Sequence, residues 1–162
     1  MSDTVVSTLS TLTTFTAADG ENLAVQDWPL LEGTSRGTVL LVHGLGEPVG
    51  RHDAAARRLN AWGFAVRGYD QYGHGESGGP RGGLTGEMRL LDDLADMVDA
   101  TRARMAAHQP LVLLGHSMGG LVAAQFVSMH LRPVDALVLS SPALDPGLNA
   151  VQKLLLATLP RI

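Results

Sequence analysis

A serine lies between two glycines at the point where a short apolar run gives way to a helical pattern. Residues 111–114, Leu-Val-Leu-Leu, are too few for a helix and predict a strand buried on both faces of a parallel sheet. The apolar spacing over residues 121–130 predicts a helix that is buried on most of its surface. Between them, Gly-His-Ser-Met-Gly-Gly at residues 115–120 has the pattern of a nucleophile elbow, which would expose Ser117 at the carboxyl edge of the sheet.

The residues around Ser117 have physical reasons to occur in such a turn. Gly115 and Gly119 have no Cβ, so neighbouring backbone can approach the turn closely. The sharp bend is expected to strain the backbone of Ser117 by about 1–3 kcal/mol, and the helix N-terminus that follows favours a developing negative charge. Without the flanking strand and helix, the same six residues would be an ordinary glycine-rich turn. This context favours chemistry at Ser117.

A second apolar run ends at another glycine-rich loop, in Thr-Val-Leu-Leu-Val-His-Gly-Leu-Gly-Glu at residues 38–47. Acyl transfer needs backbone N–H groups for the oxyanion of its tetrahedral intermediate, and such a loop offers them beside an elbow. We predict the amides of Leu45 and Met118 as the two donors. His43 is interpreted as a buried, hydrogen-bonded anchor of the loop and not as a base. A nucleotide-binding P-loop is excluded because G-x-x-x-x-G-K-[ST] is absent and Lys153 is the only lysine.

A third glycine-punctuated loop follows the short apolar stretch that begins at Ala65. Asp70, His74 and Ser77 have the residue types of a catalytic triad, but they crowd one loop that has no elbow of its own. Polar side chains commonly hold glycine-rich loops by hydrogen bonds to their backbone. We therefore interpret Asp70 and His74 as anchors of this loop.

Four motifs occur in a fixed order along the chain. They are Phe-x-x-x-Asp-Gly-x-x-Leu at 15–23, His-Gly-Leu-Gly-Glu at 43–47, Gly-Tyr-Asp-Gln-x-Gly-His-Gly-x-Ser at 68–77 and Gly-His-Ser-Met-Gly-Gly at 115–120. Together they resemble the α/β-hydrolase fold, and more closely its monoacylglycerol lipase and lysophospholipase-like branch, over roughly residues 15–142. Four ordered motifs are much more specific than one.

The resemblance implies a function as well as a fold. It implies that Ser117 is the nucleophile and that the amides of Leu45 and Met118 form the oxyanion hole. The implied reaction is hydrolysis of a carboxylic ester, typically of a lipid, without metal or cofactor. Epoxide and haloalkane chemistry in this fold usually needs an aspartate where Ser117 stands. The branch commonly has a histidine at the position of Pro48 and an arginine at that of Tyr72, and these departures concern the substrate more than the reaction class.

A catalytic base and acid are harder to find. In the resembled fold they follow the nucleophile in chain order. The only histidine after Ser117 is His130, which at a helical rise of about 1.5 Å per residue lies roughly 20 Å away. His116 precedes the nucleophile directly, and neighbouring side chains at a strand end point in opposite directions. Asp145 is a candidate for the acid, with a plain turn residue as the alternative, and the general base is not visible.

The remaining hydrophobic periodicity predicts the other elements. Strands are expected near residues 8–16, 22–28, 38–42, 64–67 and 136–140, and helices near 53–62 and 85–105. Ala54, Leu59 and Trp62 are expected to face the sheet from the first of these helices. The alternation indicates an α/β fold with a mainly parallel sheet and helices on both faces. About six strands are counted where the resembled architecture generally has eight, so the C-terminal strands and most of the cap are expected to be missing.

The helix expected at residues 85–105 is amphipathic. Its buried stripe is expected to contain Met88, Leu91, Leu94, Ala95 and Val98, and its solvated face Asp92, Asp93, Asp96 and Asp99. Acids at this spacing usually face solvent, so no metal site is assigned to them.

We divide the chain into residues 1–146, the N-terminal part of a hydrolase core, and residues 147–162, the start of a helical cap or lid. The apolar spacing of the second segment predicts an amphipathic helix that contacts lipid, packs on the core or binds a partner. The chain is then part of a longer hydrolase, or a second polypeptide or self-association completes it. The alternative is a short protein without a triad that binds an acyl ligand or acts as a structural module.

Composition excludes several other classes. A formal charge of −4 and scattered arginines give no footprint for nucleic acid. The absence of cysteine excludes disulfides and thiol catalysis. No basic leader is visible, and no apolar stretch reaches the roughly 20 residues that a membrane span needs, so a cytoplasmic location is expected.

Overall fold

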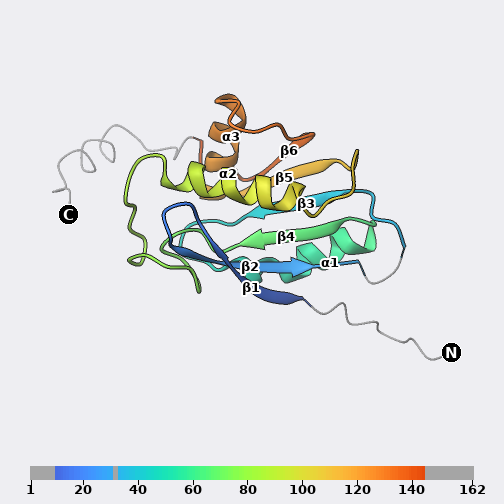
Figure 1. Cartoon of the computed structure of the whole chain (residues 1–162), viewed down its shortest axis with the longest axis horizontal. Coiled ribbons are helices and arrows are strands. Elements are labelled where there is room, and N and C mark those ends of the chain that lie inside the picture. Colours follow the sequence, from blue (N-terminus) through green and yellow to red (C-terminus); the bar gives the residue numbers. More distant parts are fainter. Residues whose placement is uncertain (1–9, 31–32, 145–162) are drawn as a thin grey trace.

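The computed structural model of the chain describes residues 10–30 and 33–144, which form one sheet with helices on both faces (Figure 1). The strands are β1 (Thr11–Thr16), β2 (Asn22–Trp28), β3 (Thr38–Val42), β4 (Ala65–Tyr69), β5 (Leu111–His116) and β6 (Ala136–Ser140). The helices are α1 (Asp53–Ala61), α2 (Arg89–Arg102) and α3 (Met118–Ser128), with a 3-10 turn η1 (Val49–His52) before α1. The expected α/β fold class is confirmed.

The sheet is mainly parallel, as the sequence predicts. Its strand order is β1-β2-β4-β3-β5-β6. The hairpin of β1 and β2 is antiparallel and β2 is antiparallel to β4, whereas β4, β3, β5 and β6 run parallel. Val42 pairs with Gly115 and Gly115 with Leu139, so β3, β5 and β6 end at the same edge. The loops after β3 and β5 are therefore neighbours, although they are far apart in sequence.

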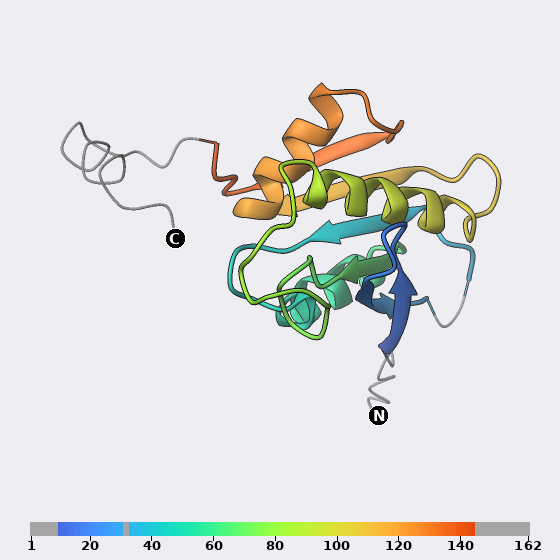
Figure 2. The ribbon, with the colours of Figure 1, turned by 60° about the vertical axis from the view of Figure 1, so that its left-hand side comes forward.

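The two faces of the sheet carry separate hydrophobic clusters. One face is covered by α1 and the other by α2 and α3 (Figure 2). Leu40 and Phe126 are buried in the cluster beneath α2 and α3, and Trp28, Leu41 and Ala56 in the cluster beneath α1. Successive residues of β3 thus enter opposite clusters, which is why this strand is apolar throughout.

One face of β5 is less buried than expected. Leu111 and Leu113 are fully buried, but Val112 and Leu114 are only half-buried. The reason is that α1 packs against β2 and β4, and that β6 is the outer strand of the described sheet. Val138 of β6, which pairs with Leu114, is 45% exposed. The prediction of a strand buried on both faces is therefore wrong for the face that carries Val112 and Leu114.

The orientation of α1 differs from the expected one. Leu59 packs against the cluster as expected, but Ala54 is exposed and Trp62 is 57% exposed. The buried positions are Ala56 and Asn60, which lie one turn apart on the same side. The Asn60 side-chain amide donates hydrogen bonds to two backbone carbonyls at 3.0 and 2.9 Å. A buried polar anchor of this kind breaks the hydrophobic pattern from which the orientation was predicted.

The expected helix at residues 85–105 is shorter in the structure, because α2 begins at Arg89. Met88 is 38% exposed and Asp93 is buried, so the places predicted for both are wrong. The cause is Arg89, whose Nε donates to the Asp93 carboxylate at 2.9 Å and whose guanidinium lies 4.1 Å from the ring centroid of Tyr72. Burial raises the pKa of Asp93 and outweighs the lowering effect of Arg89.

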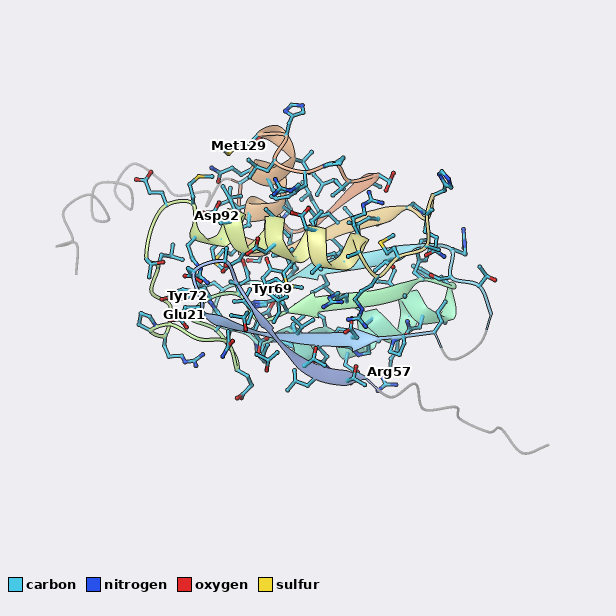
Figure 3. All side chains as sticks on the ribbon, viewed as in Figure 1. Glu21, Arg57, Tyr69, Tyr72, Asp92 and Met129 are labelled. Carbon is cyan, nitrogen blue, oxygen red and sulfur yellow. The ribbon has the colours of Figure 1, made fainter. Side chains whose placement is uncertain are left out.

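The other acids of α2 are more accessible, as predicted. Asp92, labelled in Figure 3, is exposed. Asp99 is exposed and accepts hydrogen bonds from the Arg132 Nε at 2.9 and 3.0 Å, and Asp96 accepts one from the Ala18 amide at 3.1 Å. Asp96 therefore bonds the turn between β1 and β2, and Asp99 bonds the segment that follows α3.

Only one side of α3 is buried, contrary to the prediction. Val122, Ala123 and Phe126 face the core, whereas Leu121 and Met129, both within the range predicted to be mostly buried, are 40% and 44% exposed. No helix within residues 10–30 and 33–144 is long and apolar enough to span a bilayer.

Candidate functional site

Ser117 lies in a sharp turn between β5 and α3. Its φ is +52° and its ψ is −118°, a conformation that costs a residue with a side chain on the order of 1–3 kcal/mol. Its amide donates to the Ser140 carbonyl at 3.0 Å, and its carbonyl accepts from the amides of Gly120 and Ala143, each at 3.0 Å. Bonds from both sides therefore hold a strained residue at the tip of this strand-to-helix junction.

The glycines around Ser117 are required by close backbone contacts. A Cβ on Gly119 would lie 2.2 Å from the carbonyl oxygen of Val42 and 2.4 Å from that of His43. A Cβ on Gly115 would lie 2.5 Å from the carbonyl oxygen of Gly119. The start of α3 thus packs directly on the backbone at the ends of β3 and β5, which a side chain at Gly119 or at Gly115 would prevent.

The loop after β3 reaches the same turn. A Cβ on Gly44 would lie 3.2 Å from the Ser117 Cβ, which places this loop beside the serine side chain. Within the described part of the chain, the amides of Leu45 and Met118 donate no hydrogen bond to another residue. For Met118 this follows from its place in the first turn of α3, where N–H groups have no partner in the helix. Two unpaired amides therefore lie near Ser117, one in the loop after β3 and one in the first turn of α3.

Glu47 holds the loop after β3 from within. Its Oε1 accepts a hydrogen bond from the Gly44 amide at 2.7 Å and lies 2.9 Å from the His52 Nε2, and the Arg51 Nε is 3.4 Å from its Oε2. Burial alone would raise the pKa of Glu47, but the bonds from Gly44 and His52 together lower it below its ordinary value. The His52 and His116 rings meet edge-on with centroids 5.5 Å apart.

His52 was not predicted from the sequence as a residue of this site. The available signal is its position in η1, five residues after a glutamate that follows the glycine-rich loop. Because η1 turns the chain back toward the loop, His52 approaches Glu47. Sequence spacing alone does not specify such a turn.

We expect acid to weaken the fold partly through Glu47. Because its folded pKa is lowered, Glu47 stabilises the fold above its unfolded pKa of about 4.3, and this contribution is lost as pH falls through the folded pKa. Between about pH 5 and pH 3, the melting temperature should fall more steeply for the wild-type chain than for Glu47→Gln. Thermal denaturation followed by circular dichroism measures both slopes. Glu76→Gln, which removes an exposed carboxylate, should keep the wild-type slope, and equal slopes for wild type and Glu47→Gln would contradict the assignment.

His43 is a buried anchor, as the sequence predicts. It is completely buried, and its Nε2 accepts a hydrogen bond from the Gln71 amide at 2.8 Å. The proton of the neutral ring is therefore on Nδ1, which lies 2.6 Å from the Gly44 carbonyl oxygen. Burial lowers the pKa of His43 and keeps the ring neutral. The Gln71 side-chain amide also donates to the His43 carbonyl at 2.7 Å, so the loops after β3 and β4 are joined twice.

Asp70 and His74 hold the loop after β4, which confirms the prediction that they are anchors. Asp70 Oδ1 accepts from the Val49 amide at 2.6 Å and Oδ2 from the Glu76 amide at 2.8 Å. His74 Nδ1 lies 3.0 Å from the Tyr72 carbonyl oxygen. The hydrogen bonds of these side chains are made with backbone atoms, and the two residues do not form a triad.

Replacing Asp70 with alanine should destabilise the chain by about 2 kcal/mol. The substitution leaves the amides of Val49 and Glu76 without their carboxylate, and a buried amide without a partner is costly. Chemical denaturation in urea measures the loss as a lower midpoint with an unchanged slope. Asp92→Ala, an exposed aspartate on α2, serves as the matched control and should change stability by less than about 0.5 kcal/mol. Equal midpoints for the two variants would contradict the anchoring role.

Neither His116 nor His130 is hydrogen-bonded to Ser117. The His116 Nδ1 lies 3.1 Å from the Ser140 Oγ, and no histidine in the described residues is hydrogen-bonded to Ser117. His130 follows the far end of α3. Asp145 and the expected cap segment lie outside the described residues.

Asp135 belongs to the opposite end of the sheet. Its Oδ2 accepts hydrogen bonds from the Leu111 amide and the Arg102 Nη2, both at 2.7 Å, and these bonds hold the pKa of Asp135 below its ordinary value. Leu111 begins β5, whereas Ser117 follows its end. Asp135 therefore aligns the start of β6 with β5 and is not placed to orient a base for Ser117.

Known proteins match this chain over most of its length. The family model Hydrolase_4, described as serine aminopeptidase, S33, matches residues 33–162. A monoacylglycerol lipase of Mycolicibacterium smegmatis is 36% identical over a match that covers 74% of this chain and 45% of the relative. A monoglyceride lipase of Mus musculus is 32% identical, covering 88% of this chain and 47% of the relative.

A solved structure supports the same assignment. A soluble variant of the Saccharomyces cerevisiae monoglyceride lipase, in complex with a substrate analog, superposes with a TM-score of 0.76 at 28% identity, covering 85% of this chain and 46% of that chain. The chain thus spans about half the length of the relatives that it matches. The resemblance noted in the motifs is confirmed, and the chain belongs to the serine aminopeptidase S33 family, within the α/β-hydrolase fold.

Proposed function

We propose that this chain carries the nucleophile and the oxyanion-binding half of a carboxylic ester hydrolase. The observation that supports this most is the strained backbone of Ser117, with φ of +52°, beside the loop after β3 that contains Gly44, here called the Gly44 loop. Strain of this kind concentrates at functional sites, because the surrounding structure must be built to maintain it. The names of the relatives, which are lipases, support ester chemistry.

In the proposed mechanism, the Ser117 Oγ attacks the acyl carbonyl carbon while its proton passes to a histidine base. The carbonyl oxygen becomes an oxyanion that accepts hydrogen bonds from the amides of Leu45 and Met118. Collapse of this intermediate expels the alcohol, which takes the proton from the base. Water then attacks the acyl-enzyme by the same route and releases the carboxylic acid. All six histidines of the chain lie in the described residues and none of them is hydrogen-bonded to Ser117. We therefore propose that the base, with the acid that orients it, comes from a longer form of this polypeptide or from a second one.

The proposed substrate is a lipid ester with one acyl chain, of the monoacylglycerol or lysophospholipid class. Relatives named monoacylglycerol lipase and monoglyceride lipase support this class. Residues 147–162, interpreted as the start of a cap, are the segment that we propose for peripheral contact with lipid. We place the reaction in the cytoplasm.

A fluorophosphonate probe tests the proposal, because it forms a stable bond with an activated serine. The 162-residue chain would be treated with the probe, its intact mass measured by mass spectrometry, and the chain then digested to locate the labelled residue. Labelling at Ser117, together with release of glycerol from a monoacylglycerol, is the expected result in the longer polypeptide or complex that supplies the base. An unlabelled chain with the mass of the 162 residues alone would show that these residues hold half of the site. Faster cleavage of an aminoacyl amide than of the ester would contradict the substrate class. The intact mass also reveals any second polypeptide.

The second candidate is a non-catalytic module that binds an acyl ligand. One observation favours it, since no histidine in the described residues is hydrogen-bonded to Ser117. Its expected result is tight binding of a fatty acid, measured by calorimetry, without labelling by the probe. Ser117 would then be an accessible serine without a base.

A further inference from the structure

A second candidate site lies at the opposite end of the sheet from Ser117. A cavity of about 300 Å³ is bordered by the first residues of β3 and β4 and by the last turn of α2. In Figure 1 these ends lie together on the right, whereas β3 and β4 point to the left. The length of β3 alone, at about 3.3 Å per residue, separates this cavity from the Gly44 loop by more than about 10 Å. The cavity is therefore independent of the proposed ester site.

Arg67 of β4 borders this cavity with its hydrogen-bonding capacity unused. The side chain is only 8% exposed. Its ion-pair partner in the described part of the chain is Asp27, whose Oδ1 is 3.8 Å from the Arg67 Nε, too long for a hydrogen bond. The Nε is shielded from solvent and has no hydrogen-bond partner among the described residues. A buried guanidinium of this kind gains from any acceptor that enters the cavity.

The charges of the described residues around the cavity do not balance. The Arg104 Nη1 lies 3.1 Å from the Asp27 Oδ2, so a single carboxylate serves two guanidinium groups. Burial lowers the pKa of Arg67, Asp27 opposes this effect, and repulsion from Arg104 adds to it. Within the described ranges, these three ionised groups leave one positive charge without compensation.

The walls of the cavity are of mixed character. Ala65 and Met105 contribute apolar surface beside the two arginines. Two of the hydroxyl groups at the cavity already donate hydrogen bonds, the Ser35 Oγ to the Gly37 carbonyl and the Thr101 Oγ1 to the Met97 carbonyl, both at 2.6 Å. The free polar capacity is therefore concentrated in the guanidinium groups, and the rest of the volume suits a short apolar group.

We propose that this cavity binds a small carboxylate with a short apolar tail. The carboxylate would lie against Arg67 and Arg104, because a guanidinium presents a planar pair of N–H donors that matches two carboxylate oxygens. One negative charge compensates the surplus positive charge. The tail would contact Ala65 and Met105, in a volume at the lower end of the range of small-molecule sites.

Titration of the full chain with sodium butyrate, followed by NMR of the arginine Nε–H groups, tests the proposal. We expect a saturable shift of the Arg67 signal, and binding of butyrate up to about tenfold tighter than acetate because of the added apolar surface. Arg67→Lys keeps the charge and loses the planar fork, and should weaken butyrate binding about tenfold. Arg104→Gln changes an exposed side chain and should weaken it about threefold.

The matched control is Arg58→Gln, which removes an exposed arginine of α1 and should leave butyrate binding unchanged. If Arg67→Lys does not fold, Arg104→Gln decides the question. Three results would overturn the proposal: no saturable shift at Arg67, shifts confined to the residues around Ser117, or equal affinity in the wild-type chain and both cavity variants. Saturable binding of inorganic phosphate without binding of butyrate would overturn the carboxylate assignment. None of these measurements depends on ester hydrolysis.

Discussion

Ser117→Ala is expected to abolish labelling by a fluorophosphonate and to lower ester hydrolysis by about 10⁴-fold or more. The reason is that the proposed reaction passes through a covalent bond to the Ser117 Oγ, for which alanine offers no substitute. Residual hydrolysis would come from binding and from the amides of Leu45 and Met118. Initial rates with a monoacylglycerol and with a chromogenic ester measure the loss. Full activity in this variant would show that another residue is the nucleophile.

Two further serine variants separate loss of chemistry from loss of structure. Ser128→Ala removes a hydroxyl from the exposed end of α3, where it bonds the Gln125 carbonyl at 2.9 Å, and should keep wild-type labelling. Ser117→Gly removes both the nucleophile and the backbone strain at φ of +52°. It should be inactive and yet more stable than Ser117→Ala by about 1 kcal/mol. A lower melting temperature for the glycine variant would contradict the strain.

The order of strands and helices could be predicted from the sequence because it depends on hydrophobic periodicity. The strands predicted at residues 22–28 and 136–140 begin and end at the same residues as β2 and β6. All of β3 is apolar because hydrophobic clusters cover both faces of the sheet there. The predicted orientation of α1 is wrong. The real orientation depends on Asn60, whose buried side-chain amide donates hydrogen bonds to backbone carbonyls. Likewise, Asp93 is buried only because Arg89 pairs with it. Such polar pairs interrupt the pattern that the prediction uses.

The loops around Ser117 were predictable to a different degree. Asp70 and His43 could be interpreted as anchors, because polar residues in glycine-rich loops usually bond nearby backbone. The contact between Glu47 and His52 depends on how η1 folds back, and hydrophobic periodicity carries no information about it. The base that would serve Ser117 has no sequence signal in this chain. The motifs contain no such base, and this agrees with the finding that the chain spans only about half the length of each relative.

Gly119→Ala is expected to cost more than about 3 kcal/mol of stability and to remove any activity that depends on the elbow. The new Cβ would lie 2.2 Å from the Val42 carbonyl oxygen and 2.4 Å from that of His43. Overpacking costs about 1–3 kcal/mol where side chains can yield, but these oxygens belong to the backbone at the end of β3. Relief of the clash therefore requires α3 to move away from β3, which separates Ser117 from the Gly44 loop.

The size of this effect can be distinguished from that of an ordinary glycine substitution. Gly86→Ala is the matched control, because a Cβ there meets no atom within 4 Å. It should shift the melting temperature by no more than about 2 °C, whereas Gly119→Ala should lower it by about 6 °C or more. Alanine favours helices over glycine by about 1 kcal/mol, so α3 without the contact to β3 would be stabilised by the same substitution. The sign of the measured change therefore decides whether the close approach of α3 to β3 exists in solution.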